Sequence, residues 1–120
     1  MDEYSQIFPE QHNLPNPDYQ ELYKAVLDQV IKDFHPFQLT KDIPTLLHSD
    51  FIRTYIAELI SEILKTGPSQ LSQILYRIDI SEKNIKSIPK SLTENERYEV
   101  LTDMILRREA QKVWIRKKFG

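Results

Sequence analysis

Residues 51–67 read FIRTYIAELISEILKTG, and this stretch decides the fold class. Its apolar residues come as doublets that repeat every four positions: Phe51-Ile52, Tyr55-Ile56, Leu59-Ile60 and Ile63-Leu64. An α-helix has about 3.6 residues per turn, so the apolar stripe shifts around the helix by about 40° at each doublet. A wide, shifting stripe predicts a helix near 49–66 that several neighbours contact, at the centre of the packing. Gly67 is expected to cap its end, and Pro68 prevents its continuation.

Helices are also predicted on both sides of this central segment. Asn16, Pro17 and Asp18 form a helix start signal, and the apolar residues that follow at helical spacing predict a helix near 17–34. Leu71, Ile74, Leu75 and Ile78 predict a helix near 69–79, with Ser69 as its expected cap.

The last third of the chain predicts a short helix and a long one. Ser81 and Pro89 delimit the short helix, near 82–88, with Ile85 and Ile88 expected to face inward. Thr93 and Glu96 form a capping box that opens a helix near 93–118.

The sequence therefore predicts an all-α fold, a single-domain helical bundle of four main helices plus one short helix. Residues 1–16 are expected to form an irregular N-terminal arm, and residues 17–120 a single helical domain. One alternative stays open, because the run YRIDI at 76–80 alternates apolar and polar residues as a strand does.

The composition excludes several classes of function. The chain has no cysteine, which excludes disulfides, thiolate metal sites and cysteine nucleophiles. Its two glycines cannot build a phosphate-binding loop, and its three histidines lack metal-ligand spacing. Glu58 and Glu62 lack the histidine motif of a di-iron bundle. We expect no cofactor, no metal site and no catalytic residue. No signal peptide or membrane span is predicted, so we expect a cytoplasmic protein without membrane contact.

The last helix carries apolar residues on two sides. Tyr98, Leu101, Met104 and Ile105 form one face, and the opposite face consists of Leu106, Ala110, Val113 and Trp114. One side of a peripheral helix in a small bundle normally contacts water. The second face is therefore predicted to bind a protein partner or a second copy of the chain, such as a homodimer, unless the N-terminal arm covers it. Trp114 as an ordinary core residue is the alternative.

The same helix is basic toward its end. Residues 106–120 carry six positive charges and one negative charge, from Glu109, whereas residues 1–105 carry ten and seventeen. A basic patch that binds nucleic acid is the second functional hypothesis, although the net charge of −2 counts against it. Its residues would be Arg107, Arg108, Lys112, Arg116, Lys117 and Lys118.

Arg108, Lys112 and Arg116 form a row at i, i+4 spacing, and we expect them to meet carboxylates of the acidic body. Two residues near the end of the 69–79 helix are candidates for structural ion pairs. Arg77 is expected to meet a carboxylate of the capping-box turn, and Asp79 is expected to receive Arg108 or Lys112. The sequence thus predicts a small non-catalytic interaction domain that uses its C-terminal helix.

Overall fold

The computed structural model describes residues 17–35 and 49–119. No strand occurs in these ranges, which confirms the all-α class, and the strand alternative for 76–80 is wrong because α4 continues to Ile78. The expected arm at 1–16 lies outside the described residues. The helices are α2 (Pro17–Phe34), α3 (Ser49–Thr66), α4 (Gln70–Ile78), α5 (Glu82–Lys86) and α6 (Glu94–Phe119).

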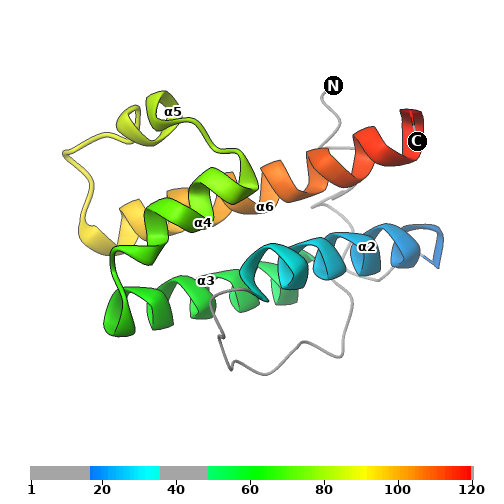
Figure 1. Cartoon of the computed structure of the whole chain (residues 1–120), viewed down its shortest axis with the longest axis horizontal. Helices are drawn as coiled ribbons and strands as arrows, with labels where there is room; N and C mark the ends of the chain where they lie inside the picture. Colours follow the sequence, from blue (N-terminus) through cyan, green and yellow to red (C-terminus); the bar gives the residue numbers. More distant parts are fainter. Residues whose placement is uncertain (1–16, 36–48, 120) are drawn as a thin grey trace.

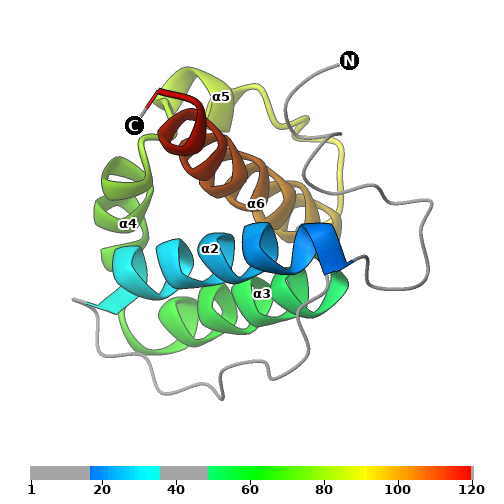
Figure 2. The same ribbon diagram turned by 90° about the vertical axis from the view of Figure 1, so that its right-hand side faces the viewer.

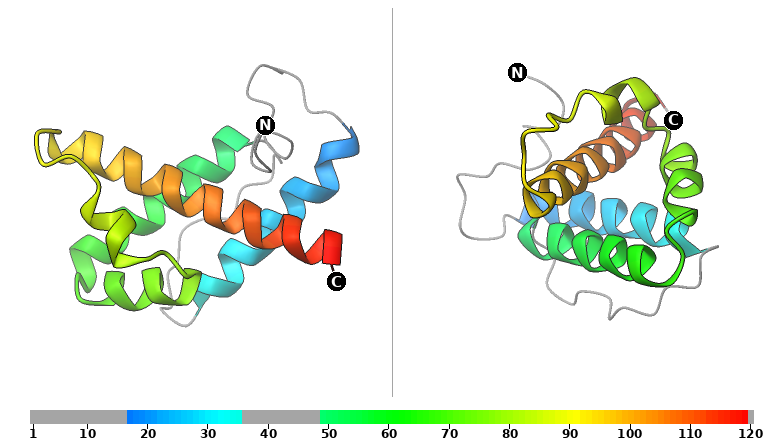
Figure 3. Two further views of the ribbon diagram at one scale, coloured as in Figure 1. Left: turned by 90° about the horizontal axis from the view of Figure 1, so that it is seen from above. Right: turned by 90° about the vertical axis from the view of Figure 1, so that its left-hand side faces the viewer.

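The long helices α2, α3 and α6 form the body of the molecule. Helices α2 and α3 lie side by side and run in the same direction, and α6 crosses over them in the opposite sense (Figure 1 and Figure 3). Helix α4 closes one side between α3 and α6 (Figure 2). Helix α3 contacts α2, α4 and α6, but it is not alone at the centre of the packing, because each of these four helices contacts the other three and the most extensive contact is between α3 and α6.

The turn after α3 differs from its prediction. The Gly67 amide donates to the Ile63 carbonyl at 2.8 Å, which continues the helical pattern, and Gly67 does not have a positive φ. Pro68 therefore ends α3 through its ring and missing N–H. Ser69 has helical backbone angles and makes no side-chain cap bond, so its expected capping role is wrong.

A left-handed residue ends α4. Asp79 has φ 75° and ψ 50°, and the amide of Ile80 donates to the Leu75 carbonyl at 2.9 Å. This six-residue bond is typical of a Schellman motif, and aspartate tolerates the left-handed region better than most residues. The motif ends α4, and the chain continues into the short helix α5.

The two remaining caps form as predicted. The Asn84 amide donates to Ser81 Oγ at 3.2 Å at the start of α5. At the start of α6 the Thr93 amide donates to Glu96 Oε1 at 3.1 Å, and the Glu96 amide donates to Thr93 Oγ1 at 3.2 Å. These reciprocal bonds satisfy two amides that a helix start leaves unpaired. They fix the first residue of the long helix.

Helix α6 is buried on both sides within its own chain. Its first half places Leu101 and Ile105 in the core, and its second half places Leu106, Ala110 and Val113 there. The change of side follows the neighbours, because α6 contacts α3, α2 and α4 along its length. A helix covered by neighbours on two sides needs apolar residues on two sides.

Candidate functional site

The predicted partner-binding face is taken up by the protein's own core. Leu106 and Ala110 are 0% exposed and Val113 is 2% exposed. Trp114 is half-buried and packs against the same core. Side chains that are already buried cannot contact a partner, so Leu106, Ala110 and Val113 do not form a docking surface in this structure. The surplus of apolar residues reflects how α6 is sandwiched inside the chain.

Four of the six residues of the predicted basic patch meet acceptors inside the protein. Arg107 Nε contacts Asp103 Oδ2 at 2.7 Å, one turn earlier on α6. The i, i+4 row reaches three other acceptors, and its members point toward α4 and α2. Arg108 donates to Asp79, Lys112 to Asp33 and Arg116 to Gln29. Cations that are held in this way do not form an open stripe along a nucleic acid backbone.

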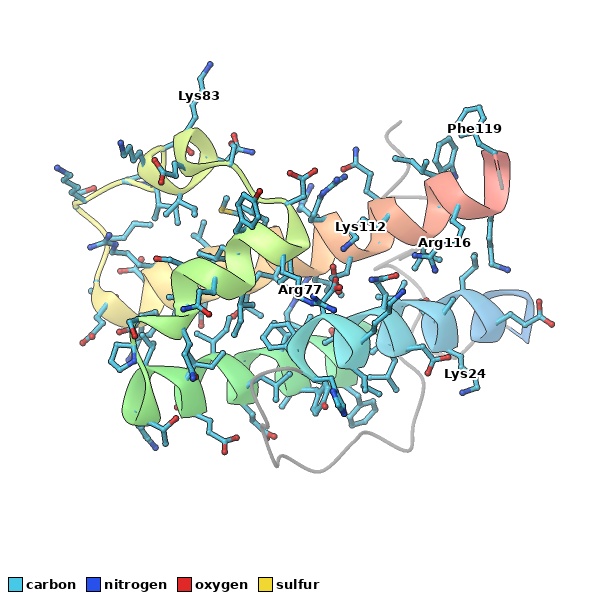
Figure 4. All side chains as sticks on the ribbon, viewed as in Figure 1. Lys24, Arg77, Lys83, Lys112, Arg116 and Phe119 are labelled. Carbon is cyan, nitrogen blue, oxygen red and sulfur yellow. The ribbon has the colours of Figure 1, made fainter. Side chains whose placement is uncertain are left out.

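The two candidate ion-pair residues of α4 have different outcomes. Arg108 Nη2 lies 2.7 Å from Asp79 Oδ2, so Arg108 and not Lys112 is the cation at Asp79. Arg77 Nε lies 3.9 Å from Asp33 Oδ1 and does not reach the capping-box turn. The reason is that α4 packs against α2 at this point, and Figure 4 shows Arg77 directed toward that helix.

A buried polar cluster joins α2, α4 and α6 at this place. Asp33 is 4% exposed and accepts hydrogen bonds from Lys112 Nζ at 2.8 Å and from Gln29 Nε2 at 3.1 Å. Gln29 in turn accepts from Arg116 Nη2. Figure 4 shows Lys112 and Arg116 pointing from α6 toward α2. Helix α6 is therefore tied to α2 by directional bonds as well as by apolar packing.

Glu109 lies in this cluster and is 0% exposed. Lys112 Nζ is 3.6 Å from its Oε1, and neither carboxyl oxygen has a hydrogen-bond partner of good geometry among the described residues. Burial, together with the hydrogen bond and charge of the neighbouring Asp33 carboxyl, raises the pKa of Glu109 from 4.5 to about 9, and Lys112 opposes this rise by a smaller amount. Glu109 is therefore protonated at neutral pH.

Asp33 behaves in the opposite way. Burial alone would raise its pKa, but the neighbouring Glu109 carboxyl and the hydrogen bonds from Lys112 and Gln29 outweigh burial and lower the pKa below its usual 3.8. The two carboxyl groups thus hold one proton between them at neutral pH, on Glu109. This arrangement resembles an acid–base pair chemically, but a fully buried carboxyl cannot be reached by a substrate. We interpret the cluster as structural.

Glu109, Asp33 and Gln29 were missed by the sequence analysis, although a signal was present. Glu109 lies three residues after Leu106 and four before Val113, on the apolar face of its helix. Asp33 stands three residues after Val30 on the apolar face of α2. A polar residue on an apolar face at helical spacing indicates a buried polar contact. Two such residues on different helices are candidates for a buried contact with each other.

A groove lies between α3 and the first half of α6, on a different part of the molecule. It has a volume of about 1230 Å³. Its apolar lining includes the exposed Ala57 and the half-buried side chains of Leu64, Leu92 and Val100. Charged residues line it as well: Glu58, Glu94, Glu96, Glu99 and Asp103, with Arg53 and Lys65 as the cations.

The acidic groups of the groove are partly organised by local bonds. Tyr98 Oη donates to Glu94 Oε1 at 2.6 Å, and this bond raises the pKa of Tyr98. The capping bond from the Thr93 amide lowers the pKa of Glu96, which keeps this carboxylate charged. Five carboxylates against two cations give the groove lining a net charge of −3. The groove thus combines an apolar floor with an acidic border.

The described residues show neither a metal site nor a membrane-spanning helix. In the described ranges, no group of three histidine, aspartate or glutamate side chains is arranged to hold a metal ion. Among the same residues, each helix is too short or too polar to cross a membrane. The chain matches no protein-family model, and neither a curated protein nor a solved structure is significantly similar to it.

Proposed function

We propose that this chain is a non-catalytic interaction domain that binds a basic, amphipathic helical segment of a protein chain in the groove between α3 and α6. The observation that carries the proposal is the groove itself, which combines half-buried apolar side chains with a net charge of −3. Grooves of this kind accept the apolar face of a helix, and charges at the border select its polar face.

The proposal keeps α6 as the interaction helix but moves the contact from its second half to its first. The first half contributes Tyr98, Val100 and Asp103 to the groove wall. The second half is occupied by the core and the buried polar cluster. A cytoplasmic setting belongs to the proposal and is supported by the absence of cysteine.

A titration with two synthetic peptides tests this function. Both peptides carry the same leucine stripe at helical spacing, and their polar faces carry either lysine or glutamate. We expect the lysine peptide to shift the backbone amide resonances of the groove residues in α3 and α6. The glutamate peptide should leave them in place, because the acidic border repels it.

A matched pair of variants locates the binding site. Ala57→Trp places a large ring in the groove and should abolish binding of the lysine peptide. Ser72→Trp makes a similar change on the exposed face of α4 and should leave binding intact. Equal binding by both variants, or resonance shifts that avoid α3, would rule out the groove as the interaction site.

A further inference from the structure

The two ends of α6 carry opposite charge. The first half borders the acidic groove, whereas residues 106–120 have a net charge of +5. Much of this positive charge is matched inside the chain, since Arg108 pairs with Asp79 and Lys112 pairs with Asp33. At the far end Arg116 contacts Gln29, which is neutral, and Lys117 is exposed. The end of the helix therefore keeps its positive charge.

The same end exposes apolar side chains. Ile115 is 41% exposed and Phe119 is 76% exposed. Figure 4 shows Phe119 at the outer end of α6, beyond Arg116. Large apolar groups beside cations are what an apolar groove with an acidic border would accept. We call the segment 115–119 the α6 tip.

The tip cannot reach the groove of its own molecule. Helix α6 has 26 residues and is continuous, so its two ends are about 39 Å apart. Figure 1 places the start of α6 and the C-terminus at opposite ends of the molecule. Complementary surfaces that a rigid helix holds apart can meet only between copies. The chain's own N-terminal arm is a poor occupant, because residues 1–16 carry Asp2, Glu3 and Glu10 and no lysine or arginine.

We propose that the α6 tip of one copy docks in the α3–α6 groove of the next, so that copies associate head to tail. This inference rests on the proposed function of the groove and names its occupant. A head-to-tail contact uses two different surfaces, so a dimer joined by one contact still has one undocked tip and one undocked groove, to which further copies can add. The tip offers five residues, far fewer than the roughly 20–30 residues a side of a stable interface, so the association should be weak and need concentrated protein.

Sedimentation velocity on the full chain over a range of concentrations tests this geometry. The wild-type protein should show an average mass that rises with concentration beyond that of a dimer. The tip variant, Lys117→Glu with Phe119→Ser, should associate at least about tenfold more weakly, as should the groove variant, Glu58→Lys with Glu99→Lys. All four substituted side chains are exposed, so each variant should keep the helical content of the wild type.

Mixing the two variants gives the decisive result. The groove variant still has a basic tip, and the tip variant still has an acidic groove. A one-to-one mixture should therefore form a heterodimer and stop there, because the remaining tip and groove are the damaged ones. Lys83→Glu on α5 and Glu21→Lys on α2 change exposed charges elsewhere and should associate like the wild type.

Salt provides an independent check on the charge argument. Raising the ionic strength from about 0.01 M to about 1 M shortens the screening length from about 30 Å to about 3 Å and should weaken association at least tenfold. A wild-type chain that stays monomeric, a dimer that grows no further, or a variant mixture without a heterodimer would each overturn the head-to-tail contact. The peptide titration would then decide separately whether the groove binds a helix at all.

Discussion

Replacing Glu109 with glutamine should stabilise the protein by an amount that grows with pH. In the unfolded chain the pKa of Glu109 is 4.5, and in the folded chain burial raises it to about 9. Between these values the folded state binds one more proton than the unfolded state. The free energy of unfolding of the wild type therefore falls by about 1.4 kcal/mol for each pH unit in this range.

Glutamine has nearly the shape of the protonated acid and cannot ionise, so Glu109→Gln avoids this loss. At pH 4.5 the two proteins should be similarly stable, because Glu109 is protonated in the folded chain and half-protonated in the unfolded chain, a difference of only about 0.4 kcal/mol. At pH 7 the variant should be more stable by about 3 kcal/mol, a value that depends on the unfolded pKa and not on how far the folded pKa lies above neutrality. The difference should approach roughly 6 kcal/mol near pH 9.

Urea unfolding followed by circular dichroism at several pH values measures this difference. Glu99→Gln makes the same chemical change on the exposed face of the same helix and should leave the pH dependence of the wild type unchanged. The reasoning would be refuted if the stabilities of wild type and Glu109→Gln ran parallel from about pH 5 to about pH 9, since linkage requires them to diverge.

Two further predictions concern the polar contacts of α2 and α4. Asp33→Asn keeps the side-chain shape but removes the charge that faces Lys112 and Arg77, and should cost about 3 kcal/mol at pH 7 in urea unfolding. Because the pKa of Asp33 is lowered in the folded chain, the difference in free energy of unfolding between wild type and variant should shrink as the pH falls through and below 3.8. A difference that stays the same at low pH would contradict the role of the Asp33 charge. Asp79→Ala and Asp79→Gly both remove the bond to Arg108, but only alanine is strained at φ 75°, so the alanine variant should be less stable by about 1 kcal/mol. Equal thermal unfolding of these two variants would argue against backbone strain at this position.

The sequence predicted the helices well because their signals are local. The doublets of α3, the Ser81 cap and the Thr93–Glu96 capping box each depend on residues within a few positions of one another. The end of α4 was harder to predict, since the left-handed conformation falls on Asp79 and not on a glycine. Propensity favours glycine there, and the pattern gave no reason to expect aspartate.

The candidate sites were less predictable because they depend on which helices meet. The second apolar face of α6 has the same pattern whether it contacts a partner or the chain's own α2 and α4. Only the packing distinguishes these cases, and it buries Leu106, Ala110 and Val113. The groove likewise joins α3, which ends at Thr66, to α6, which begins 28 positions later at Glu94, so no local pattern marks it.

The buried polar cluster also explains why the orientation of α6 is well defined. Apolar side chains attract without strong directional preference, so apolar packing alone leaves the rotation of one helix against another weakly determined. Asp33 accepts bonds from Lys112 and Gln29, and Gln29 accepts one from Arg116. A rotation of α6 would break these bonds and leave a buried carboxylate unpaired, which costs about 3–5 kcal/mol. The cluster thus fixes the direction in which the second half of α6 projects across α2.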